Sequence, residues 1–333
     1  MDINELLLYL FEGKPLTQQQ SKHLFTAIIN GELLNEQLSA ALIALKLRGE
    51  TTKEITGAVY AALENAEFFP SPNYEFADIV GTGGDGANTI NISTASAIVA
   101  AAAGFKVAKH GNRSVSSKSG SSDVLNALGI KIDMDANTAR KALDEINLCF
   151  LWAQQYHTGF KHVAYVRQLL KTRTIFNILG PLCNPARPPY QLLGVYSADL
   201  IQPYAETVAR LGHKHTIVVH GAGLDEVAIH SKTDVAEIRD GKIARYILSP
   251  RDFGLKSQPL ESLRGDDPNE NAKILTALLK GKGKTAHVQA VAMNTALLMK
   301  LFGHDDLKQN TMQIIELINS GKAFETLEKL IVY

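Results

Sequence analysis

The sequence predicts an α/β protein, in which a small all-helical domain precedes a larger α/β domain with a central, mostly parallel sheet flanked by helices. Helical periodicity fills the first 68 or so residues. A Pro-Ser-Pro break follows at residues 70–72, and after it short β-branched runs alternate with alanine-rich helical stretches. Such alternation is typical of a parallel sheet covered by helices. A chain of 333 residues is long enough for two domains.

Capping boxes predict where two of the N-terminal helices begin. Residues 17–20 (TQQQ) and 51–54 (TTKE) each place a threonine three positions before a glutamine or glutamate, and an amphipathic run follows each. Between them, apolar residues at positions 38, 41, 42 and 45 fall on one helical stripe. A stripe of this kind is typical of a core or a subunit interface, so we assign no chemistry to this region.

The elements expected after the break are short. Strands are expected at residues 76–80, 105–108, 149–153 and 216–220, and helices at 95–103, 124–128, 286–302 and 311–319. In an open α/β sheet the carboxyl ends of the strands form the ligand crevice. The polar segments that follow these strands are therefore the candidate binding segments.

Charge and composition exclude several classes of protein. Lysine plus arginine total 34 and aspartate plus glutamate total 34, so no global field attracts nucleic acid or an anionic membrane. No run approaches the ~18 uncharged apolar residues of a membrane span, and the acidic start does not fit a signal peptide. We expect a cytoplasmic protein with no nucleic-acid or membrane partner. Cys149 and Cys183 are too few for a disulfide framework and are expected in the core.

The sharpest motif follows the first expected strand and reads GTGGDG at residues 81–86. Four glycines leave backbone N–H groups free to close on an anion. The run also fits the G-x-G-x-x-G pattern of dinucleotide-binding proteins. That pattern requires an acidic residue about 20 positions later, and residues 100–108 contain none. An anion-binding loop is therefore favoured, with a structural tight turn as the alternative.

Two further polar segments point to a phosphate. Residues 88–94 (NTINIST) lead into an expected helix, where hydroxyls and amides lie beside the positive end of the helix dipole. An ordinary helix cap is the alternative. Residues 109–123 (KHGNRSVSSKSGSSD) follow the second strand and gather cationic side chains, two glycines and six serines. A solvated surface loop is the alternative for this segment.

An acidic pair, Asp225 and Glu226, follows the strand at 216–220 and a glycine turn. Hard oxygen ligands on a flexible turn suit Mg²⁺, which takes few protein carboxylates and shares phosphate oxygens. Adjacent acids are usually only exposed, but a phosphate site nearby favours a metal. Residues 283–285 (GKT) resemble the end of a P-loop, but Leu278 stands where that motif needs glycine. No H-E-x-x-H or G-x-S-x-G string is present, and the catalytic residue is unknown because no general base is evident.

The strings GTGGDG, NTINIST, KHGNRSVSSKSGSSD, VRQLLKTRTIFNILGPL and GLDE, in this order, resemble the anthranilate phosphoribosyltransferases over about residues 20–330. The resemblance implies transfer of the phosphoribosyl group of 5-phosphoribosyl-1-diphosphate (PRPP) to the amine of anthranilate, with Mg²⁺. The products would be N-(5-phosphoribosyl)anthranilate and diphosphate, in the second step of tryptophan synthesis from chorismate. It also implies a helical domain of residues 1–70 plus roughly 168–190, forming the interface of a homodimer, and an α/β domain of residues 71–167 and 191–333.

The resemblance assigns the site residues. PRPP would be contacted by Gly81, Gly84, Asp85, Thr89, Asn91, Ile92, Ser93, Thr94, Lys109, His110, Gly111, Asn112, Arg113, Ser114, Val115, Ser116, Ser117 and Ser121. Anthranilate would meet Gly81, Asn112 and Arg167, the last through its carboxylate, with His110 and Ser121 nearby. Mg²⁺ would be held by Ser93, Asp225 and Glu226. Anthranilate synthase or an amidotransferase subunit is a candidate partner.

The sequence departs from the family pattern in two places. Residues 157–160 read HTGF where many members have His-Pro-Ala-Met, which affects a substrate-side loop, and the turn at residues 221–223 looks shorter than in some members. Three other functions stay open. One is a pyrimidine nucleoside phosphorylase of the same fold. Another is a relative that takes a different aromatic acceptor or binds nucleic acid, and the third is a non-catalytic nucleotide-binding regulator.

Overall fold

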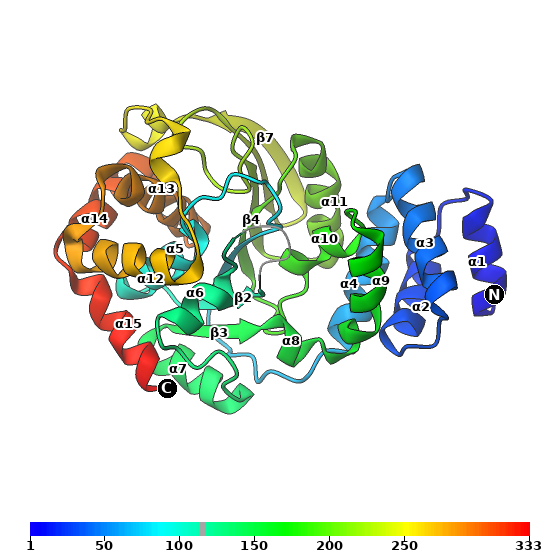
Figure 1. Cartoon of the computed structure of the whole chain (residues 1–333). Helices are drawn as coiled ribbons and strands as arrows, with labels where there is room; N and C mark the ends of the chain where they lie inside the picture. The colour runs from blue at the N-terminus through cyan, green and yellow to red at the C-terminus, as the bar shows by residue number, and fades with distance from the viewer. Residues whose placement is uncertain (114–117) are drawn as a thin grey trace.

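A central sheet organises the larger part of the chain (Figure 1). The computed structural model describes residues 1–113 and 118–333, and within them the sheet has seven strands in the order β3-β2-β1-β4-β5-β6-β7. Neighbours from β3 to β5 run parallel, and β6 and β7 are antiparallel. The prediction of a mostly parallel sheet is confirmed. The strands are β1 (Ala77–Gly81), β2 (Val107–Gly111), β3 (Leu148–Trp152), β4 (Tyr190–Gly194), β5 (His215–His220), β6 (Thr233–Arg239) and β7 (Lys242–Leu248).

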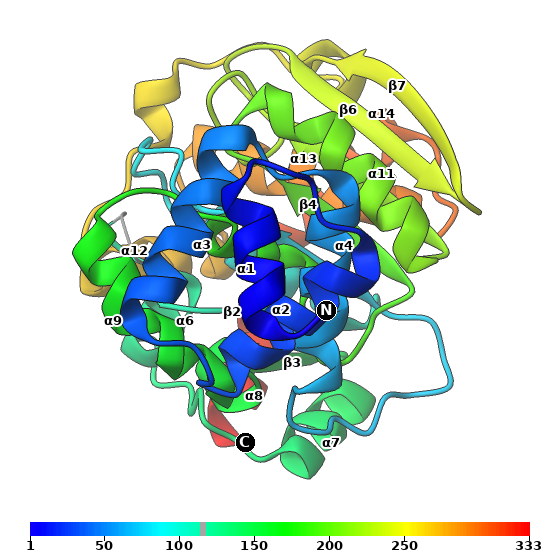
Figure 2. The same cartoon turned by 90° about the vertical axis from the view of Figure 1, so that its right-hand side faces the viewer.

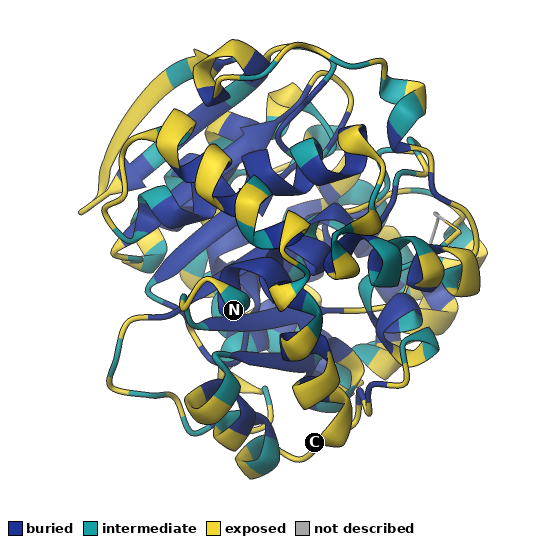
Figure 3. Cartoon of the chain, turned by 90° about the vertical axis from the view of Figure 1, so that its left-hand side faces the viewer, coloured by how far each residue is buried: buried dark blue, intermediate teal, exposed yellow. Residues whose placement is uncertain are grey.

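Both faces of the parallel strands are buried, as Figure 3 shows for the sheet between its helices. Side chains on a strand alternate between faces, so Leu192 and Ile217 join one hydrophobic core while Leu193 and Val218 join another. Burial on both sides explains the apolar stretches in these strands, and it also encloses polar side chains such as Asp78, Lys109 and His110.

Helices on the first face pack over the strands that carry the candidate motifs. α5 contacts β1, β2 and β3, and α13 contacts β4, β5 and α5. α11 lies on the second face against β5 and β6. The helices of this larger part are α5 (Ile92–Ala102), α6 (Ser121–Ala127), α7 (Ala136–Ile146), α11 (Ile201–Leu211), α12 (Pro268–Ala277), α13 (Thr285–Leu301), α14 (Leu307–Asn319) and α15 (Lys322–Val332).

The N-terminal helices form a separate group on one side of the sheet (Figures 1 and 2). Both predicted capping boxes are present, because Thr17 and Gln20, and likewise Thr51 and Glu54, cap each other's backbone. α9 packs on α2 and α3, and α10 packs on α4. This group consists of α1 (Ile3–Phe11), α2 (Gln18–Ile29), α3 (Asn35–Arg48), α4 (Thr52–Glu64), α9 (Lys161–Leu170) and α10 (Phe176–Leu179). The short helix α8 (Ala153–Tyr156) precedes α9 along the chain. The domain boundaries stay a prediction.

Three strands were not expected from the sequence. β4 was missed, and so was the hairpin of β6 and β7, whose turn residues Asp240 and Gly241 have φ of 49° and 75°. An Asp-Gly pair is a strong hairpin signal because both turn positions need left-handed backbone. Both cysteines are buried and free, as predicted. Across residues 1–113 and 118–333, no helix combines the length and apolar character needed to cross a membrane.

Candidate active site

The three polar motifs and the acidic pair meet where the order of the strands reverses. From β1 the chain continues to β2 and β3 on one side, and later to β4 and β5 on the other. Ligand crevices of open α/β sheets form at the carboxyl ends of strands at such a point. The glycine loop after β1 is hydrogen-bonded to the acidic turn after β5, and the start of α5 contacts both that turn and the loop after β2. The structure therefore brings together the motifs that the sequence separates.

Asp225 packs directly against two glycines at this edge of the sheet. Gly81 and Gly194 are paired across β1 and β4. A Cβ at Gly81 would lie 2.1 Å from Asp225 Oδ2, and a Cβ at Gly194 would lie 1.6 Å from the Asp225 carbonyl oxygen. The Gly83 N–H donates to Asp225 Oδ2 at 2.6 Å. Only glycine at both strand ends leaves room for this carboxylate beside the glycine loop.

The turn that carries the acidic pair is held by its own backbone and by His220. Gly221 and Leu224 exchange hydrogen bonds of 2.8 and 3.2 Å between their backbones. His220 Nε2 accepts from the Gly223 N–H at 3.1 Å, and its Nδ1 donates to the Val195 carbonyl at 2.8 Å. The short turn predicted as a departure from the family pattern is thus closed tightly and presents both acids to the crevice.

Glu226 lies against the beginning of α5. Its Oε1 accepts from the Ser93 N–H at 3.1 Å and from Ser93 Oγ at 2.5 Å. Burial and the charges of Glu226 and Asp85 raise the pKa of Asp225 well above its usual range. Burial likewise raises the pKa of Glu226 to about 7, against the hydrogen bonds from Ser93. Burial and mutual repulsion therefore disfavour a negative charge on both carboxyl groups unless a cation joins them.

The donor set fits Mg²⁺ bound together with a substrate. Among the described residues, no three His, Cys, Asp or Glu side chains cluster as a ready-made metal cage. Mg²⁺ is usually bound by one or two carboxylates plus substrate phosphates and waters. Two adjacent carboxylates with raised pKa values, beside a serine hydroxyl and an anion-binding loop, match that requirement.

Lys109 and His110 reach the site from β2, and both are buried. Lys109 Nζ donates to the Ile79 carbonyl at 2.6 Å, and burial lowers its pKa against the raising effect of the nearby carboxylates. His110 Nδ1 donates to the Gly180 carbonyl at 3.2 Å, which leaves Nε2 as an acceptor with no partner among the described residues. Burial lowers the pKa of His110 to about 3, so the imidazole is neutral at physiological pH.

A buried hydrogen-bond network around Asp78 joins β1 to β2. Asp78 accepts from the His110 N–H at 3.2 Å and from Asn184 Nδ2 at 2.8 Å, and Asn184 also donates to the Ala108 carbonyl at 2.8 Å. Asp78 is fully buried, and burial raises its pKa to about 6. This network holds the backbone of His110 and thereby sets the direction of its side chain.

The loop after β2 is described only in part, because Ser114, Val115, Ser116 and Ser117 lie outside the described residues. Before them, Asn112 and Arg113 are exposed, and the Arg113 guanidinium lies 5.6 Å from the Trp152 ring centroid. After them, Ser121 Oγ donates to the Asn112 carbonyl at 3.3 Å. A Cβ at Gly111 would lie 2.2 Å from Ser121 Oγ, so this residue too needs to be glycine.

The start of α5 is more than an ordinary cap. Asn91 occupies the N-cap position but makes no side-chain cap hydrogen bond. Its Nδ2 donates to the Ser119 carbonyl at 3.1 Å, and its Oδ1 accepts from Asn271 Nδ2 at 3.0 Å. Ile92 and Thr94 are buried, so their side chains face the core and only their backbone is placed for a ligand.

The remaining predicted donor residues lie on the glycine loop and on the segment that follows it. Gly84 has a left-handed φ of 75°, and Asp85 Oδ1 accepts from the Ala87 N–H at 3.0 Å. Thr89 forms an isolated antiparallel bridge with Arg264. Gly84, Asp85 and Thr89 are all partly exposed at the edge of the crevice.

Arg167 lies on α9, among the N-terminal helices. Its guanidinium is half-buried, 5.6 Å from the Phe176 ring centroid, and burial lowers its pKa. A series of ring contacts runs from Phe176 through Phe160 and His157 to His110, with centroids 5.4, 5.1 and 5.5 Å apart. The departing string at residues 157–160 thus supplies two of the rings between Arg167 and the strand that carries His110.

Sequence reasoning missed Arg173 as an individual residue. It lies within the string VRQLLKTRTIFNILGPL, and its guanidinium donates to the Gly84 carbonyl of the glycine loop. It also missed Asn184 and Asn271, which connect motifs through side-chain amides. Nothing in their local sequence distinguishes these amides from surface residues, because their partners are more than 70 residues away along the chain.

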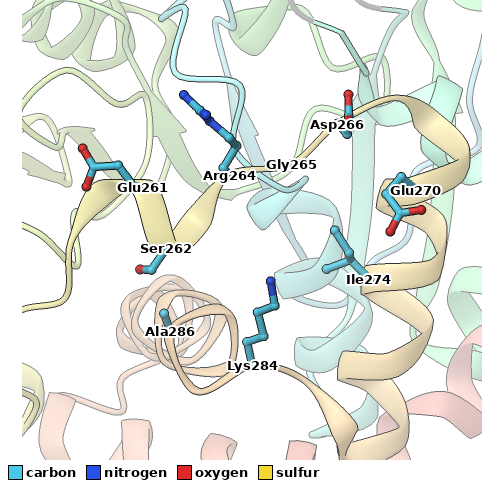
Figure 4. A pocket seen from close by; sticks show the side chains of 9 residues that line it. All are labelled: Glu261, Ser262, Arg264, Gly265, Asp266, Glu270, Ile274, Lys284 and Ala286. Carbon is cyan, nitrogen blue, oxygen red and sulfur yellow. The ribbon is translucent and has the colours of Figure 1, made fainter.

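A separate hollow of about 570 Å³ is lined partly by the segment that is hydrogen-bonded to residues 88–90 (Figure 4). Its lining includes Ser262, Gly265 and Lys284, and the Gly265 N–H donates to the Asn88 carbonyl at 2.8 Å. The described lining contains none of the residues predicted to bind substrate or metal. The candidate site is therefore the place where the glycine loop, the acidic turn and the start of α5 meet, and not this hollow.

Comparison with known proteins identifies the class. Residues 4–66 match a family model described as the helical bundle domain of a glycosyl transferase family, and residues 73–324 match the model of its a/b domain. The chain is thus a two-part member of that glycosyl transferase family.

Closer relatives define the particular family. The chain is 68% identical to the anthranilate phosphoribosyltransferase of Pasteurella multocida and 65% identical to that of Haemophilus influenzae strain PittEE, over 333 residues and all of each chain. The chain belongs to the anthranilate phosphoribosyltransferase family. It shares 38% identity and a TM-score of 0.92 with the enzyme of Thermus thermophilus, over 98% of both chains. The Saccharomyces cerevisiae enzyme in complex with PRPP and Mg is 32% identical with a TM-score of 0.90, over 99% of this chain and 97% of that one.

The substitution Gly194→Ala tests the packing of Asp225 against the end of β4. The added Cβ would meet backbone, which has no room to move aside, so we expect the free energy of unfolding to fall by about 1–3 kcal/mol. Gly180→Ala is the matched control, because a Cβ there meets nothing within 4 Å and φ is helical. It should change the free energy by less than about 1 kcal/mol. Equal effects of the two substitutions in urea denaturation would contradict the packing described for Asp225.

The raised pKa of Asp78 predicts a pH dependence of stability. Its pKa is about 6 in the folded chain against a usual 3.8, so the stability from the protonated form is complete below pH 3.8 and is lost as pH rises to about 6. The difference is on the order of 3 kcal/mol. Asp78→Asn cannot titrate, so the difference in unfolding free energy between wild type and Asp78→Asn should decline between pH 4 and 6 and then stay level. A difference that is constant from pH 4 to 8 would show that burial does not raise the pKa of Asp78.

Proposed function

We propose that this chain transfers the phosphoribosyl group of PRPP to the amine of anthranilate, giving N-(5-phosphoribosyl)anthranilate and diphosphate. The observation that carries the proposal is the placement of Asp225 and Glu226 against the glycine loop and the start of α5. Acidic side chains beside an anion-binding loop need a cation between them and a polyphosphate. Membership of the family supplies the donor and the acceptor.

The donor site consists of the glycine loop, the start of α5 and the loop after β2. Backbone N–H groups of the glycine loop and the positive end of the α5 dipole favour the phosphates. The residues that we propose for PRPP are those assigned from the sequence, with Lys109 acting as a buried cation behind the loop. Ser93, Asp225 and Glu226 would hold Mg²⁺, which supplies positive charge to the diphosphate when bound.

Catalysis would depend on position and charge and would need no general base. The amine of anthranilate is a weak base that needs little deprotonation before it attacks the ribose C1, so the departing diphosphate needs most of the stabilisation. Preorganised N–H donors in a partly buried crevice provide it without reorganisation at the moment of reaction. The glycine loop, held by the Asp225 carboxylate, meets this requirement.

The acceptor would bind between α9 and β2. Arg167 offers a guanidinium for the carboxylate of anthranilate, and Asn112 offers an exposed amide near the carboxyl end of β2. His110 is neutral, and its Nε2 would accept a hydrogen bond from the amine. The rings of His157 and Phe160 separate these groups and would give the aromatic acceptor an apolar wall.

We further propose the assembly and the location. Residues 1–70 with roughly 168–190 would form the helical domain and the interface of a homodimer. Large apolar side chains are exposed on α1, α3 and α9, among them Leu8, Leu47 and Leu169 at 65, 80 and 62%. Exposed apolar faces of this kind are typical of subunit contacts. The enzyme would act in the cytoplasm, and an anthranilate synthase amidotransferase subunit remains a candidate partner.

The proposed reaction predicts that anthranilate fluorescence decays when wild-type chain, PRPP and Mg²⁺ are combined. Asp225→Asn combined with Glu226→Gln should lower kcat by at least about 100-fold, because the negative charge that would hold the metal at the diphosphate is lost. The Mg²⁺ dependence should disappear as well. The matched control is Asp240→Asn, an exposed acid on the β6–β7 turn, which should leave both unchanged.

Two results would contradict the proposed function. Folded wild-type chain that consumes no anthranilate, but splits thymidine or uridine with phosphate, would instead be a pyrimidine nucleoside phosphorylase. A chain whose melting temperature rises with PRPP, without turnover of any acceptor, would be a nucleotide-binding regulator. Unchanged kcat and Mg²⁺ dependence in the double variant would remove Asp225 and Glu226 from the mechanism.

A further inference from the structure

Arg173 lies between the two halves of the proposed site, in the segment that joins α9 to α10. α9 carries Arg167, and Lys171 follows the helix with a left-handed φ of 48°. Thr172 then receives a hydrogen bond from Lys46 Nζ on α3. The Thr172 hydroxyl thereby links this segment to the N-terminal helices, while the Arg173 side chain extends to the glycine loop.

Two contacts fix the Arg173 guanidinium. It donates a hydrogen bond to the Gly84 carbonyl oxygen, and its Cζ lies 4.0 Å from the centroid of the Tyr196 ring. A guanidinium so close to a ring is held by a cation–π contact. The Tyr196 N–H in turn donates to Thr82 Oγ1 at 3.0 Å. Arg173 and the residue that supports it therefore both contact the glycine loop.

The contact with Gly84 determines how one peptide of the loop is oriented. Gly83 and Gly84 have φ of 67° and 75°, and glycine meets little steric restriction, so sterics alone do not decide the loop conformation. Asp225 fixes the peptide before Gly83 by accepting its N–H. Arg173 fixes the peptide after Gly84. Because that peptide is planar and trans, the Asp85 N–H points away from the carbonyl that Arg173 holds.

We propose that Arg173 is a positioning residue for the donor substrate, which orients the Gly84–Asp85 peptide with the Tyr196 ring as its platform. The inference rests on the proposed function, because it assigns the glycine loop to PRPP. It predicts an effect on PRPP binding and none on anthranilate binding, since the contacts of Arg173 described above lie on the donor loop and its support. Arginine is required because its planar group can donate and stack at once, whereas lysine offers a point charge.

Steady-state kinetics with each substrate varied, together with calorimetric binding of PRPP and Mg²⁺, tests the inference. Arg173→Ala should raise KM and Kd for PRPP roughly tenfold, as expected for loss of one charge-assisted hydrogen bond. The KM for anthranilate should not change. Arg173→Lys should lie between Arg173→Ala and wild type. Tyr196→Phe keeps the ring and should match wild type, whereas Tyr196→Leu should resemble Arg173→Ala.

A double-variant cycle separates positioning from general destabilisation. Arg173→Ala with Tyr196→Leu should raise the KM for PRPP no more than Arg173→Ala does, because both remove the same support. Arg245→Ala is the matched control, and it should leave both KM values unchanged. This exposed arginine lies on the edge strand β7 and donates to Gln202 on α11, away from the glycine loop. Should Arg173→Ala fail to fold, Arg173→Lys and Tyr196→Leu carry the same test.

The inference is overturned if Arg173→Ala binds PRPP as tightly as wild type. It is also overturned if both KM values rise together with a lower melting temperature, which would be a purely structural effect. Failure of the proposed function looks different, because wild type would then not consume anthranilate at all. In that case the Kd for PRPP of Arg173→Ala relative to wild type still decides whether Arg173 positions the loop.

Discussion

The structure of the site depends on the close contact between Asp225 and the paired glycines at the ends of β1 and β4. Gly81 and Gly194 allow the carboxylate to lie directly on the edge of the sheet, where the strand order reverses. Its Oδ2 holds the Gly83 N–H, so the acidic turn and the glycine loop become one unit. Glu226 then extends this unit to the start of α5 through Ser93. One steric requirement thus brings the groups proposed for metal and anion binding together.

Burial gives these groups their chemical character. The parallel strands are covered on both faces, so Lys109 and His110 are shielded from water. The His110 imidazole therefore stays neutral, and Lys109 Nζ donates to the Ile79 carbonyl instead of to solvent. The same burial raises the pKa values of Asp225 and Glu226, which makes a bound cation favourable. Asp78 holds the two strands in register beneath them. The site is therefore tightly packed on the side of the sheet and polar on the side where the loops meet.

The sequence predicted the fold class and the three motifs because their signals are local. Periodicity, capping boxes and runs of glycine act over a few residues, and the structure confirms the helical start and the parallel sheet. β4 was missed because it is short and interrupted by Gln191, and β7 because it is largely exposed and lacks a clear alternation. The Asp240-Gly241 pair did carry a hairpin signal, which our prediction did not include. Arg173 was missed for a different reason: its partner, Gly84, is 89 residues away, and only folding shows that the two meet.

A crystal structure of the chain with PRPP and Mg²⁺, in the absence of anthranilate, would show directly whether Asp225 joins the metal to the glycine loop. We expect a metal ion on the Asp225 carboxylate, with the diphosphate against the glycine loop at the ends of β1 and β4. Asp225 should keep its place on Gly81 and Gly194 in that complex. PRPP bound elsewhere, for example in the hollow lined by Ser262, Gly265 and Lys284, or a metal ion with no contact to Asp225, would contradict the account.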